Sequence, residues 1–403
     1  MTWDYFEELL KRPSIFLDES KLDINFVPEK LVSREKELSL LSQLFLPLIT
    51  NPNAISRKIL ITGKTGVGKT ATVKLFGDVL IKTAKKREIA INYVHINCRK
   101  EKTSYKVLIR IIRALNENFP KRGYSPQDLL EILMDFLNDK NLHLLIVLDE
   151  FSYLINKNGE LIYSLTRIDD ENLYKPQRIS IIGIVRNPSC LNNLDVATLS
   201  TLQRNMIHFE NYTKEQIYDI LKYRAEISIE KEAFNDEIIE MISDLVSENG
   251  DIRYGLNLLW KSGKIAESKN LKCITLECVR LANQAIVPFT TLDTLQFMSS
   301  QKLIFLLAII KSLKTKQKSE ISIPEILEIY KTLCEAQGLS PRSYSKIWNF
   351  LQEFKKESII SMNIQSESIK GRKVSITIQN IDINTLNTLV NEILNSKGIS
   401  FNS

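Results

Sequence analysis

The sequence contains no apolar run long enough to cross a membrane. Its longest such stretch, Leu303 to Ile310, has eight residues, whereas a membrane-spanning helix needs about 20. The N-terminal segment carries Asp4, Glu7 and Glu8, where a secretory signal peptide would be apolar. We therefore expect a protein that stays inside the cell and has no membrane partner.

Cysteine is scarce, and the sequence shows no internal repeat and no low-complexity segment. The five cysteines are odd in number, and their one close pair, Cys273 and Cys278, has no histidine nearby. This pattern is typical of a reduced compartment and argues against both a disulfide framework and a zinc site.

Length and composition indicate a globular protein of several domains. The chain has 403 residues, of which 44% are apolar and 25% are charged, enough for two or three separate cores. The net charge is +6, and the 14 Lys and Arg against 10 Asp and Glu in residues 290–403 place +4 of it there. A polyanionic partner and lysines solvated on helix faces both explain such an excess.

Short apolar strands alternate with amphipathic helices in the first half of the chain. The expected strands are Lys58–Thr62, Ile89–Asn97, Leu144–Leu148 and Ile179–Val185. The expected helices are Arg34–Leu48, Lys69–Ala84, Tyr105–Leu115 and Ser125–Leu137. This alternation predicts a parallel sheet with helices on both faces and a ligand site at the carboxyl ends of the strands.

The second half is helical until a terminal hairpin. Helices are expected at Thr213–Ile227, Asp236–Val246, Ile252–Lys264 and Thr275–Ala285, which together predict a small helical domain. Three more helices, Gln301–Leu313, Ser322–Ala336 and Pro341–Lys356, precede strands at Ile359–Ile364 and Val374–Ile378, the order of a winged helix. The predicted domains are residues 1–210, 211–290 and 291–403.

A glycine-rich turn follows the first strand. The sequence GKTGVGKT, residues 63–70, matches G-x-x-x-x-G-K-[ST] between a strand and a helix, the context of a phosphate-binding loop. Its glycines let backbone N–H groups surround a β-phosphate, Lys69 reaches the β and γ oxygens, and the Thr70 hydroxyl ligates Mg²⁺. A glycine-rich turn without a ligand is the alternative. The predicted nucleotide contacts are Gly63, Thr65, Gly66, Val67, Gly68, Lys69, Thr70 and Ala71.

Polar residues end two of the other strands. Asp149 and Glu150 follow Leu144–Leu148, so we expect Asp149 to hold the metal and Glu150 to polarise the water that attacks the γ-phosphorus. Asn187, after the next strand, is a candidate for orienting the same water, or it merely starts a turn with Pro188.

These motifs, taken in order, resemble a known family. GKTGVGKT, LLIVLDE, IIGIVRN and GDIRYGLNLLW, followed by a winged helix, resemble the AAA+ ATPases, and among them the archaeal origin-recognition and helicase-loading initiators. The resemblance covers the chain from about Phe16 to about Ile381. It implies an α/β AAA+ P-loop domain with a parallel sheet, a small α-helical lid domain and a C-terminal winged-helix domain.

The resemblance also implies roles for residues outside the loop. Asn187 would be the first sensor, and Arg253 the second, reaching the γ-phosphate from the lid; from the sequence alone, Arg253 is equally well an exposed residue in the first turn of a helix. The segments around Val27, Pro28 and Arg34 are similar to the family's N-terminal linker, whose residues flank the adenine. The cofactors implied are ATP or ADP with Mg²⁺.

One departure from the family concerns an arginine that acts on a neighbouring subunit. Family members carry an Asp-Pro-Arg segment near the end of the ATPase domain, whereas this chain has Leu-Asp-Val-Ala at residues 194–197. Arg204 is a candidate substitute. Because such an arginine speeds phosphoryl transfer by orders of magnitude, we expect a weak ATPase that uses ATP as a conformational ligand.

Duplex DNA contacts are predicted in three places. The third helix of the winged helix exposes Arg342, Ser343, Tyr344 and Lys346, which suit a major groove. The hairpin tip holds Lys370, Arg372 and Lys373, which suit a minor groove or phosphates. By the resemblance, Lys121 and Arg122 in the ATPase domain would add phosphate contacts. A basic hairpin that is only solvated, or a winged helix used for protein contacts, is the alternative.

Together these features predict an ATP-binding DNA replication initiator that recognises origin duplex DNA and helps to load the replicative helicase. Its expected partners are double-stranded origin DNA, related initiator paralogues on DNA and the replicative helicase, and its expected location is the cytoplasm, at the nucleoid. Alternatives are a nucleotide-switched regulator that acts through protein contacts or on promoters, and a transposition or plasmid-partition ATPase.

Overall fold

The structure, a computed structural model, describes residues 14–155, 159–167, 176–203, 205–247, 250–285, 295–316, 320–357, 359–367, 371–378 and 383–401. Its contacts divide the chain into two compact units. One unit comprises residues 16–231 and 235–256, and the other comprises the residues up to 15, residues 232–234 and the chain from 257 onward. The predicted domain boundaries stay a prediction.

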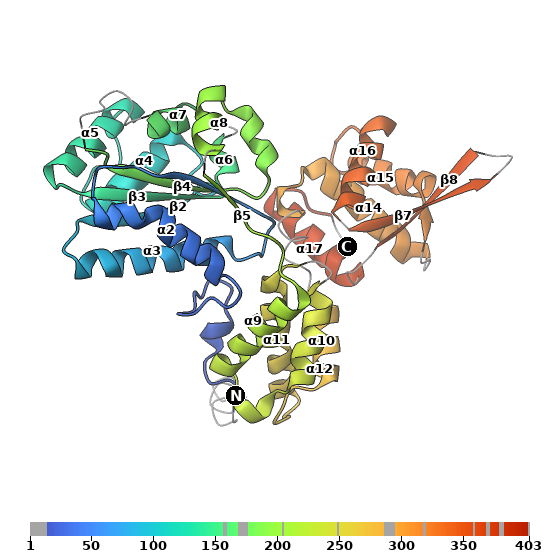
Figure 1. The fold of residues 1–403 in the computed structure, drawn as a ribbon. Coiled ribbons are helices and arrows are strands. Elements are labelled where there is room, and N and C mark those ends of the chain that lie inside the picture. Colours follow the sequence, from blue (N-terminus) through green and yellow to red (C-terminus); the bar gives the residue numbers. More distant parts are fainter. Residues whose placement is uncertain are drawn as a thin grey trace, which may run out of the picture. The chain divides into compact units, whose positions relative to one another are not determined.

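A five-stranded sheet forms the centre of the first unit (Figure 1). Its strands lie in the order β2 (Ile91–Asn97), β3 (His143–Asp149), β4 (Ile179–Ile184), β1 (Lys58–Thr62) and β5 (Met206–His208). All neighbouring strands are parallel, so their carboxyl ends meet at one edge, where ligands bind in such sheets. The predicted parallel sheet is therefore confirmed.

Helices cover both faces of this sheet. On one face, α2 (Glu35–Thr50) and α3 (Lys69–Lys86) pack apolar residues such as Phe45 and Phe76 against alternate positions of β1, β3 and β4. On the other face lie α4 (Ser104–Leu115), α5 (Pro126–Asp139), α6 (Ser152–Ile155), α7 (Gly159–Arg167) and α8 (Val196–Gln203). β3 is buried along its whole length, because helices occupy both of its faces.

The same unit also contains helices after the sheet, and one of them packs against the N-terminal segment. α9 (Lys214–Ser228) packs on α10 (Asp236–Ser247), and α11 (Ile252–Ser268) begins in this unit. The 3₁₀ helix η1 (Glu19–Leu22) packs on α9. The buried Arg224 of α9 donates hydrogen bonds to the backbone oxygens of Lys21 at 2.6 Å and Asp23 at 3.0 Å, which fixes the linker in place. Two further 3₁₀ helices are η2 (Pro188–Asn193) and η3 (Lys231–Ala233).

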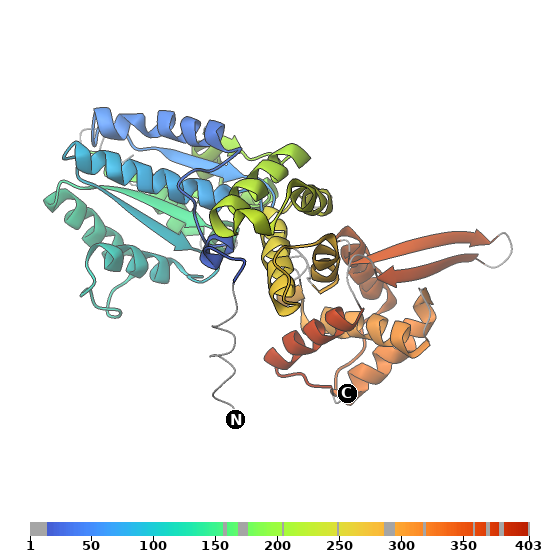
Figure 2. The ribbon, with the colours of Figure 1, turned by 90° about the horizontal axis from the view of Figure 1, so that it is seen from below.

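The second unit contains the end of α11, then α12 (Leu276–Ala285) and a winged helix. The latter comprises α14 (Ser300–Lys316), β6 (Ile321–Ser322), α15 (Ile323–Ala336), α16 (Tyr344–Lys356), β7 (Ile360–Glu367), β8 (Gly371–Ile378) and α17 (Ile383–Ser396). The three strands form an antiparallel sheet in the order β6-β8-β7. The apolar run 303–310 of α14 is fully buried in its core. Both views show β7 and β8 extending as a hairpin past the helices of the winged helix (Figures 1 and 2).

Several elements differ from the prediction. β5, β6 and α17 were not predicted, and α16 begins at Tyr344, three residues after Pro341. Ser343 is the N-cap of α16, with the extended backbone that an N-cap residue adopts (φ −63°, ψ 155°). Arg342 and Ser343 therefore precede the helix that was expected to carry them.

Among the residues that the structure describes, no helix combines the length and apolar character needed to cross a membrane.

Candidate functional site

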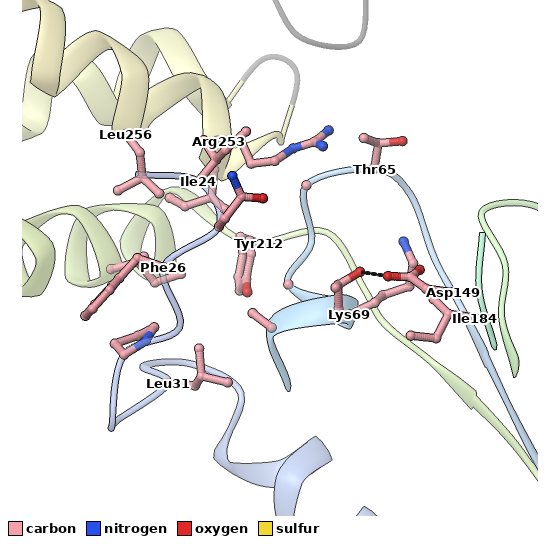
Figure 3. A pocket seen from close by; sticks show the side chains of 18 of the residues that line it. Ile24, Phe26, Leu31, Thr65, Lys69, Asp149, Ile184, Tyr212, Arg253 and Leu256 are labelled. Atoms are coloured by element: carbon pink, nitrogen blue, oxygen red, sulfur yellow. Dashed lines mark hydrogen bonds between the residues drawn. The ribbon is translucent and has the colours of Figure 1, made fainter. Parts of the chain in front are cut away.

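A cavity of about 310 Å³ opens at the carboxyl ends of the strands in the first unit. Its two ends differ in chemistry (Figure 3). Ile24, Phe26, Leu31 and Leu256 line one end, and Thr65, Lys69 and Asp149 line the other. The loop after β1 thus meets the linker and the start of α11 around one cavity that has an apolar end and a charged end.

The glycine-rich loop has the backbone that a phosphate cradle requires. Gly66 and Gly68 have φ angles of +79° and +87°, and a side chain on Gly68 would come within 2.4 Å of the Tyr212 hydroxyl. Lys69 donates from Nζ to the backbone oxygens of Gly63 at 2.7 Å and Lys64 at 2.5 Å. The lysine therefore folds back over the loop, where a phosphate would contact it.

Burial lowers the pKa of Lys69 to about 8. The nearby Asp149 opposes this shift, while the positive charges of Arg186 and Arg253 add to it. A buried cation next to two other cations favours an anionic ligand at this end of the cavity.

Asp149 lies at the end of β3, opposite the loop. The Thr70 hydroxyl donates to its Oδ2 at 2.8 Å, and His95 Nε2 lies 3.3 Å from the same oxygen. Although burial favours the neutral form of Asp149, the hydrogen bonds from His95 and Thr70 lower its pKa. A hydroxyl and an ionised carboxylate side by side are oxygen ligands of the kind that Mg²⁺ prefers, so Thr70 and Asp149 fit the predicted metal site.

His95 belongs to a short hydrogen-bonded chain that sequence reasoning missed. The Tyr93 hydroxyl lies 2.8 Å from His95 Nδ1. Since the Asp149 carboxylate can only accept, His95 donates to it from Nε2. Both side chains come from β2, and their alternate positions on that strand put them on the same face of the sheet.

Glu150 lines the cavity beside Arg186. Arg186 donates to Glu150 Oε1 from Nη2 at 2.7 Å and from Nε at 3.2 Å. Glu150 itself has a φ of +53°, a left-handed backbone that costs energy for a residue with a β-carbon.

The structure does not place Asn187 in the cavity. Its side chain is exposed and accepts a hydrogen bond from the Ser189 backbone N–H at 2.9 Å, which makes it the N-cap of η2. The neighbouring Arg186 lines the cavity instead. The alternative weighed for Asn187, that it starts a turn, agrees with this geometry.

Arg253 lines the cavity from the first turn of α11. Its guanidinium makes a bidentate pair with Asp251, at 3.1 Å from Nε to Oδ1 and 2.9 Å from Nη2 to Oδ2. Asp251 is buried and packs directly on Gly66 of the loop. The arginine is thus held next to the loop by a residue that sequence reasoning missed.

The linker residues fall into two groups. Pro28 lines the cavity, whereas Val27 and Arg34 do not. Arg34 is buried, stacks 4.0 Å from the centre of the Tyr212 ring, and donates to Val67 O at 3.0 Å and Glu210 O at 2.6 Å. Arg34 was expected to flank the adenine. Instead it holds the backbone of the loop at Val67 and does not line the cavity.

Most of the predicted loop residues line the cavity, and two do not. Thr65, Gly66, Gly68, Lys69, Thr70 and Ala71 line the cavity. Gly63 contributes the backbone oxygen that Lys69 contacts, and Val67 is buried in the core.

The predicted DNA-contacting residues in the first turn of α16 and just before it lie on the surface. Arg342, Ser343, Tyr344 and Lys346 are all exposed, Tyr344 at 60%. The next residue, Ile347, is buried in the core of the winged helix, so the helix turns one face inward and leaves its N-terminal residues in solvent. Lys370 lies outside the described residues, as do the side chains of Arg372 and Lys373 and the candidate arginine Arg204.

Lys121 and Arg122 are exposed in an ordered loop between α4 and α5. The Tyr105 hydroxyl donates to Lys121 O at 2.8 Å, and the rings of Phe119 and Tyr124 stack with centres 5.2 Å apart. The loop is therefore held by contacts to α4 and within itself while both cationic side chains face solvent.

Comparisons with known proteins match successive parts of the chain. Residues 56–187 match an AAA domain, residues 218–284 a Cdc6 AAA+ ATPase-type lid domain, and residues 293–387 a CDC6 C-terminal winged helix domain. These matches confirm the predicted order of three domain types.

Whole-chain relatives agree with the domain matches. ORC1-type DNA replication protein 2 of Sulfurisphaera tokodaii is 31% identical over 96% of this chain and 95% of its own length. Its namesake in Saccharolobus solfataricus is 32% identical over 90% of each chain. The structure of Aeropyrum pernix ORC1 in complex with DNA is 26% identical, covers 94% of this chain and 97% of its own, and superposes with a TM-score of 0.74. This chain therefore belongs to the family of ORC1-type DNA replication proteins.

Proposed function

We propose that the protein is an ATP-binding DNA replication initiator that recognises origin duplex DNA and helps to load the replicative helicase. The observation that carries this proposal is the combination, in one member of the ORC1-type family, of a loop-lined cavity with a winged helix that exposes Arg342, Tyr344 and Lys346. The DNA complex of the Aeropyrum pernix relative supports the same role.

The cavity is proposed to hold ATP or ADP. The apolar end, with Ile24, Phe26 and Leu256, suits an adenine ring, and the loop end suits the phosphates because Lys69 and the loop backbone supply donors there. Thr70 and Asp149 would hold Mg²⁺, which when bound neutralises charge on the β- and γ-phosphates. Arg253, placed by Asp251, would contact the γ-phosphate from α11.

Hydrolysis is proposed to be slow. Glu150 is the group placed to polarise an attacking water, but the structure pairs it with Arg186. The stretch 194–197 also lacks the expected arginine. ATP would then act first as a conformational ligand, and turnover would stay below about 1 per second, the low end of typical enzymes.

Duplex DNA is proposed to contact three basic surfaces. The exposed residues at the start of α16 would enter a major groove, Lys121 and Arg122 would meet phosphates, and Lys370, Arg372 and Lys373 would act at the tip of the β7–β8 hairpin. Initiator paralogues and the replicative helicase are proposed as further partners at the nucleoid, on the basis of the family alone.

Removing charge from the start of α16 tests the DNA role. We expect Arg342→Ala combined with Lys346→Ala to weaken duplex binding at least tenfold, because each lost contact costs on the order of 1–3 kcal/mol. The matched control is Lys397→Ala combined with Lys331→Ala, which removes the same charge from exposed positions of the same winged-helix region. Equal affinity of both double variants would reject a DNA role for α16.

A chromatin-binding map in the host separates the initiator from a promoter-bound regulator. Peaks at replication origins are expected. Peaks spread over promoters would support the regulator instead, and an absence of peaks would favour a protein that acts through protein contacts.

A further inference from the structure

His95 of β2 approaches Asp149 from outside the cavity. Its Nε2 lies 3.3 Å from Asp149 Oδ2, the oxygen that also accepts a hydrogen bond from the Thr70 hydroxyl at 2.8 Å. Thr70 and Asp149 line the cavity, whereas His95 does not, and the histidine side chain is only 17% exposed. His95 therefore lies behind the two proposed metal ligands, where it can hold Asp149 without facing a ligand itself.

Tyr93 contacts the other nitrogen of the His95 ring. The Tyr93 hydroxyl lies 2.8 Å from His95 Nδ1 and 3.4 Å from the backbone oxygen of Val73 in α3. The tyrosine ring packs on Gly77 of the same helix, where a β-carbon would come within 2.5 Å of the ring. Burial raises the pKa of Tyr93, so its hydroxyl stays protonated. The histidine ring is thus held on its second nitrogen by a side chain that is packed on α3.

These contacts form a ring that begins and ends on α3. His95 pairs in the sheet with Val147, two residues before Asp149. Because side chains alternate between the faces of a strand, His95 and Asp149 both project from the face that α3 covers. In the first turn of α3, Thr70 contacts Asp149, and the backbone one turn later lies next to the Tyr93 hydroxyl. Asp149 is therefore connected to α3 directly and also through two residues of β2.

We propose that His95 is a positioning residue for Mg²⁺, because its hydrogen bond holds the Asp149 carboxylate beside the Thr70 hydroxyl. This inference rests on the proposed binding of nucleotide with Mg²⁺. A hydroxyl has one proton and two lone pairs, so Thr70 can donate to Asp149 and still ligate an ion. Without His95, Asp149 Oδ2 would depend on Thr70 alone for its orientation. Hydrogen-bond partners of this kind typically change metal affinity by about 10–100-fold when they are removed.

Calorimetric titrations of the full chain with ADP test this role without relying on turnover. The dissociation constant of ADP would be measured in EDTA and over a series of Mg²⁺ concentrations. We expect His95→Leu to raise the Mg²⁺ concentration that half-saturates the effect by about tenfold, and to change ADP affinity in EDTA by less than about twofold. The matched control is His208→Leu, a histidine at the carboxyl end of β5 that contacts Thr62 Oγ1 at 2.8 Å, and it should change neither quantity.

His95→Gln tests whether the hydrogen bond is what matters. The glutamine amide carries N–H donors and can replace His95 Nε2 as the donor to Asp149 Oδ2. We therefore expect this variant to keep a Mg²⁺ requirement close to that of the wild type. If His95→Gln lost as much Mg²⁺ affinity as His95→Leu, the histidine would act by something other than this hydrogen bond, and the inference would be overturned.

The two proposals fail in different ways. If the wild type binds no ADP with or without Mg²⁺, the proposed nucleotide site is rejected and the inference with it. If the wild type binds ADP, only the inference is overturned by either of two results: no effect of Mg²⁺ on the wild type, or an equal loss of ADP affinity in EDTA and in Mg²⁺ for His95→Leu. Urea unfolding would check that each variant folds, and His95→Met, which is unbranched and adaptable, replaces a His95→Leu that does not.

Discussion

His95 and His143 lie on neighbouring strands and have opposite roles. His95 is near the carboxyl end of β2, where it contacts Asp149. His143 is the first residue of β3, at the amino ends of the strands. There it is buried, and its ring nitrogens lie 2.9 Å from Ser180 Oγ and 3.1 Å from Gln177 O. One histidine therefore contacts Asp149 at the candidate site, and the other is a buried residue of the sheet.

Burial lowers the pKa of His143 to about 4, which makes stability depend on pH. The unfolded histidine titrates near 6.5, so between these values the unfolded chain binds a proton that the folded chain does not. Stability is therefore complete above about pH 6.5 and falls as the pH drops toward 4, with a slope of at most about 1.4 kcal/mol per pH unit from this group.

Urea unfolding of wild type and His143→Gln between pH 7 and 4 measures this contribution. The glutamine cannot be protonated in this range and can still contact Ser180. Wild type should lose stability relative to the variant as the pH falls, and parallel curves for the two proteins would contradict the assignment.

At the scale of elements, the strongest sequence patterns predicted the core of the fold. β1, β3 and β4 are dominated by apolar residues, and the loop GKTGVGKT fixes where α3 begins. β5 has three residues, too few for a strand pattern to be recognised in the sequence. Its pairing with β1 makes it a strand. The sequence alone cannot show such a non-local pairing.

The site was predictable in its motifs and less so in its supporting residues. The loop and the acidic pair Asp149 and Glu150 could be recognised because each motif is contiguous in the sequence and adjoins a strand. Arg186 was missed in favour of Asn187, since both follow β4 and only the path of the chain decides which side chain faces the cavity. Asp251 and Tyr212 were missed because each acts on a loop more than a hundred residues earlier in the chain.

Within the winged helix, Tyr330 of α15 contacts α14 and the segment just before α16. Its buried hydroxyl donates to Gln301 Oε1 at 2.5 Å and accepts from the Arg342 backbone N–H at 3.4 Å. Tyr330→Phe leaves both groups without this partner, so we expect a loss of about 1–3 kcal/mol in unfolding free energy.

Thermal unfolding would measure this loss. Tyr105→Phe is the matched control, because its hydroxyl makes an exposed contact to Lys121 O and its loss should change stability by less than about 0.5 kcal/mol. Equal shifts for the two variants would show that the Tyr330 hydroxyl does not stabilise the winged helix.

At the scale of the whole chain, net charge is modest and its placement matters more than its total. The chain carries +6, yet the exposed cations proposed for DNA occur in separate segments, Lys121 and Arg122 in one and Arg342 and Lys346 in another. A duplex that engages several such segments releases counterions from each of them.

The salt dependence of duplex affinity should therefore report the total number of phosphates that all these segments neutralise. If about six phosphates are neutralised, duplex affinity falls more than a thousandfold between 50 and 200 mM salt. Combining Lys121→Ala and Arg122→Ala should lower the logarithmic slope by about two units. Binding titrations across this salt range would measure both quantities. An unchanged slope in the variant would show that Lys121 and Arg122 do not contact DNA phosphates.

Arg34 makes the N-terminal linker part of the support of the glycine-rich loop. One guanidinium joins the linker to Val67 in the loop and to Glu210 after β5, so segments from three distant parts of the chain meet at one side chain. A shortened fragment that starts just before β1 would keep the complete glycine-rich sequence and still lose this brace. We expect its purified form to take up nucleotide poorly, even though every recognisable motif of the ATPase would be present.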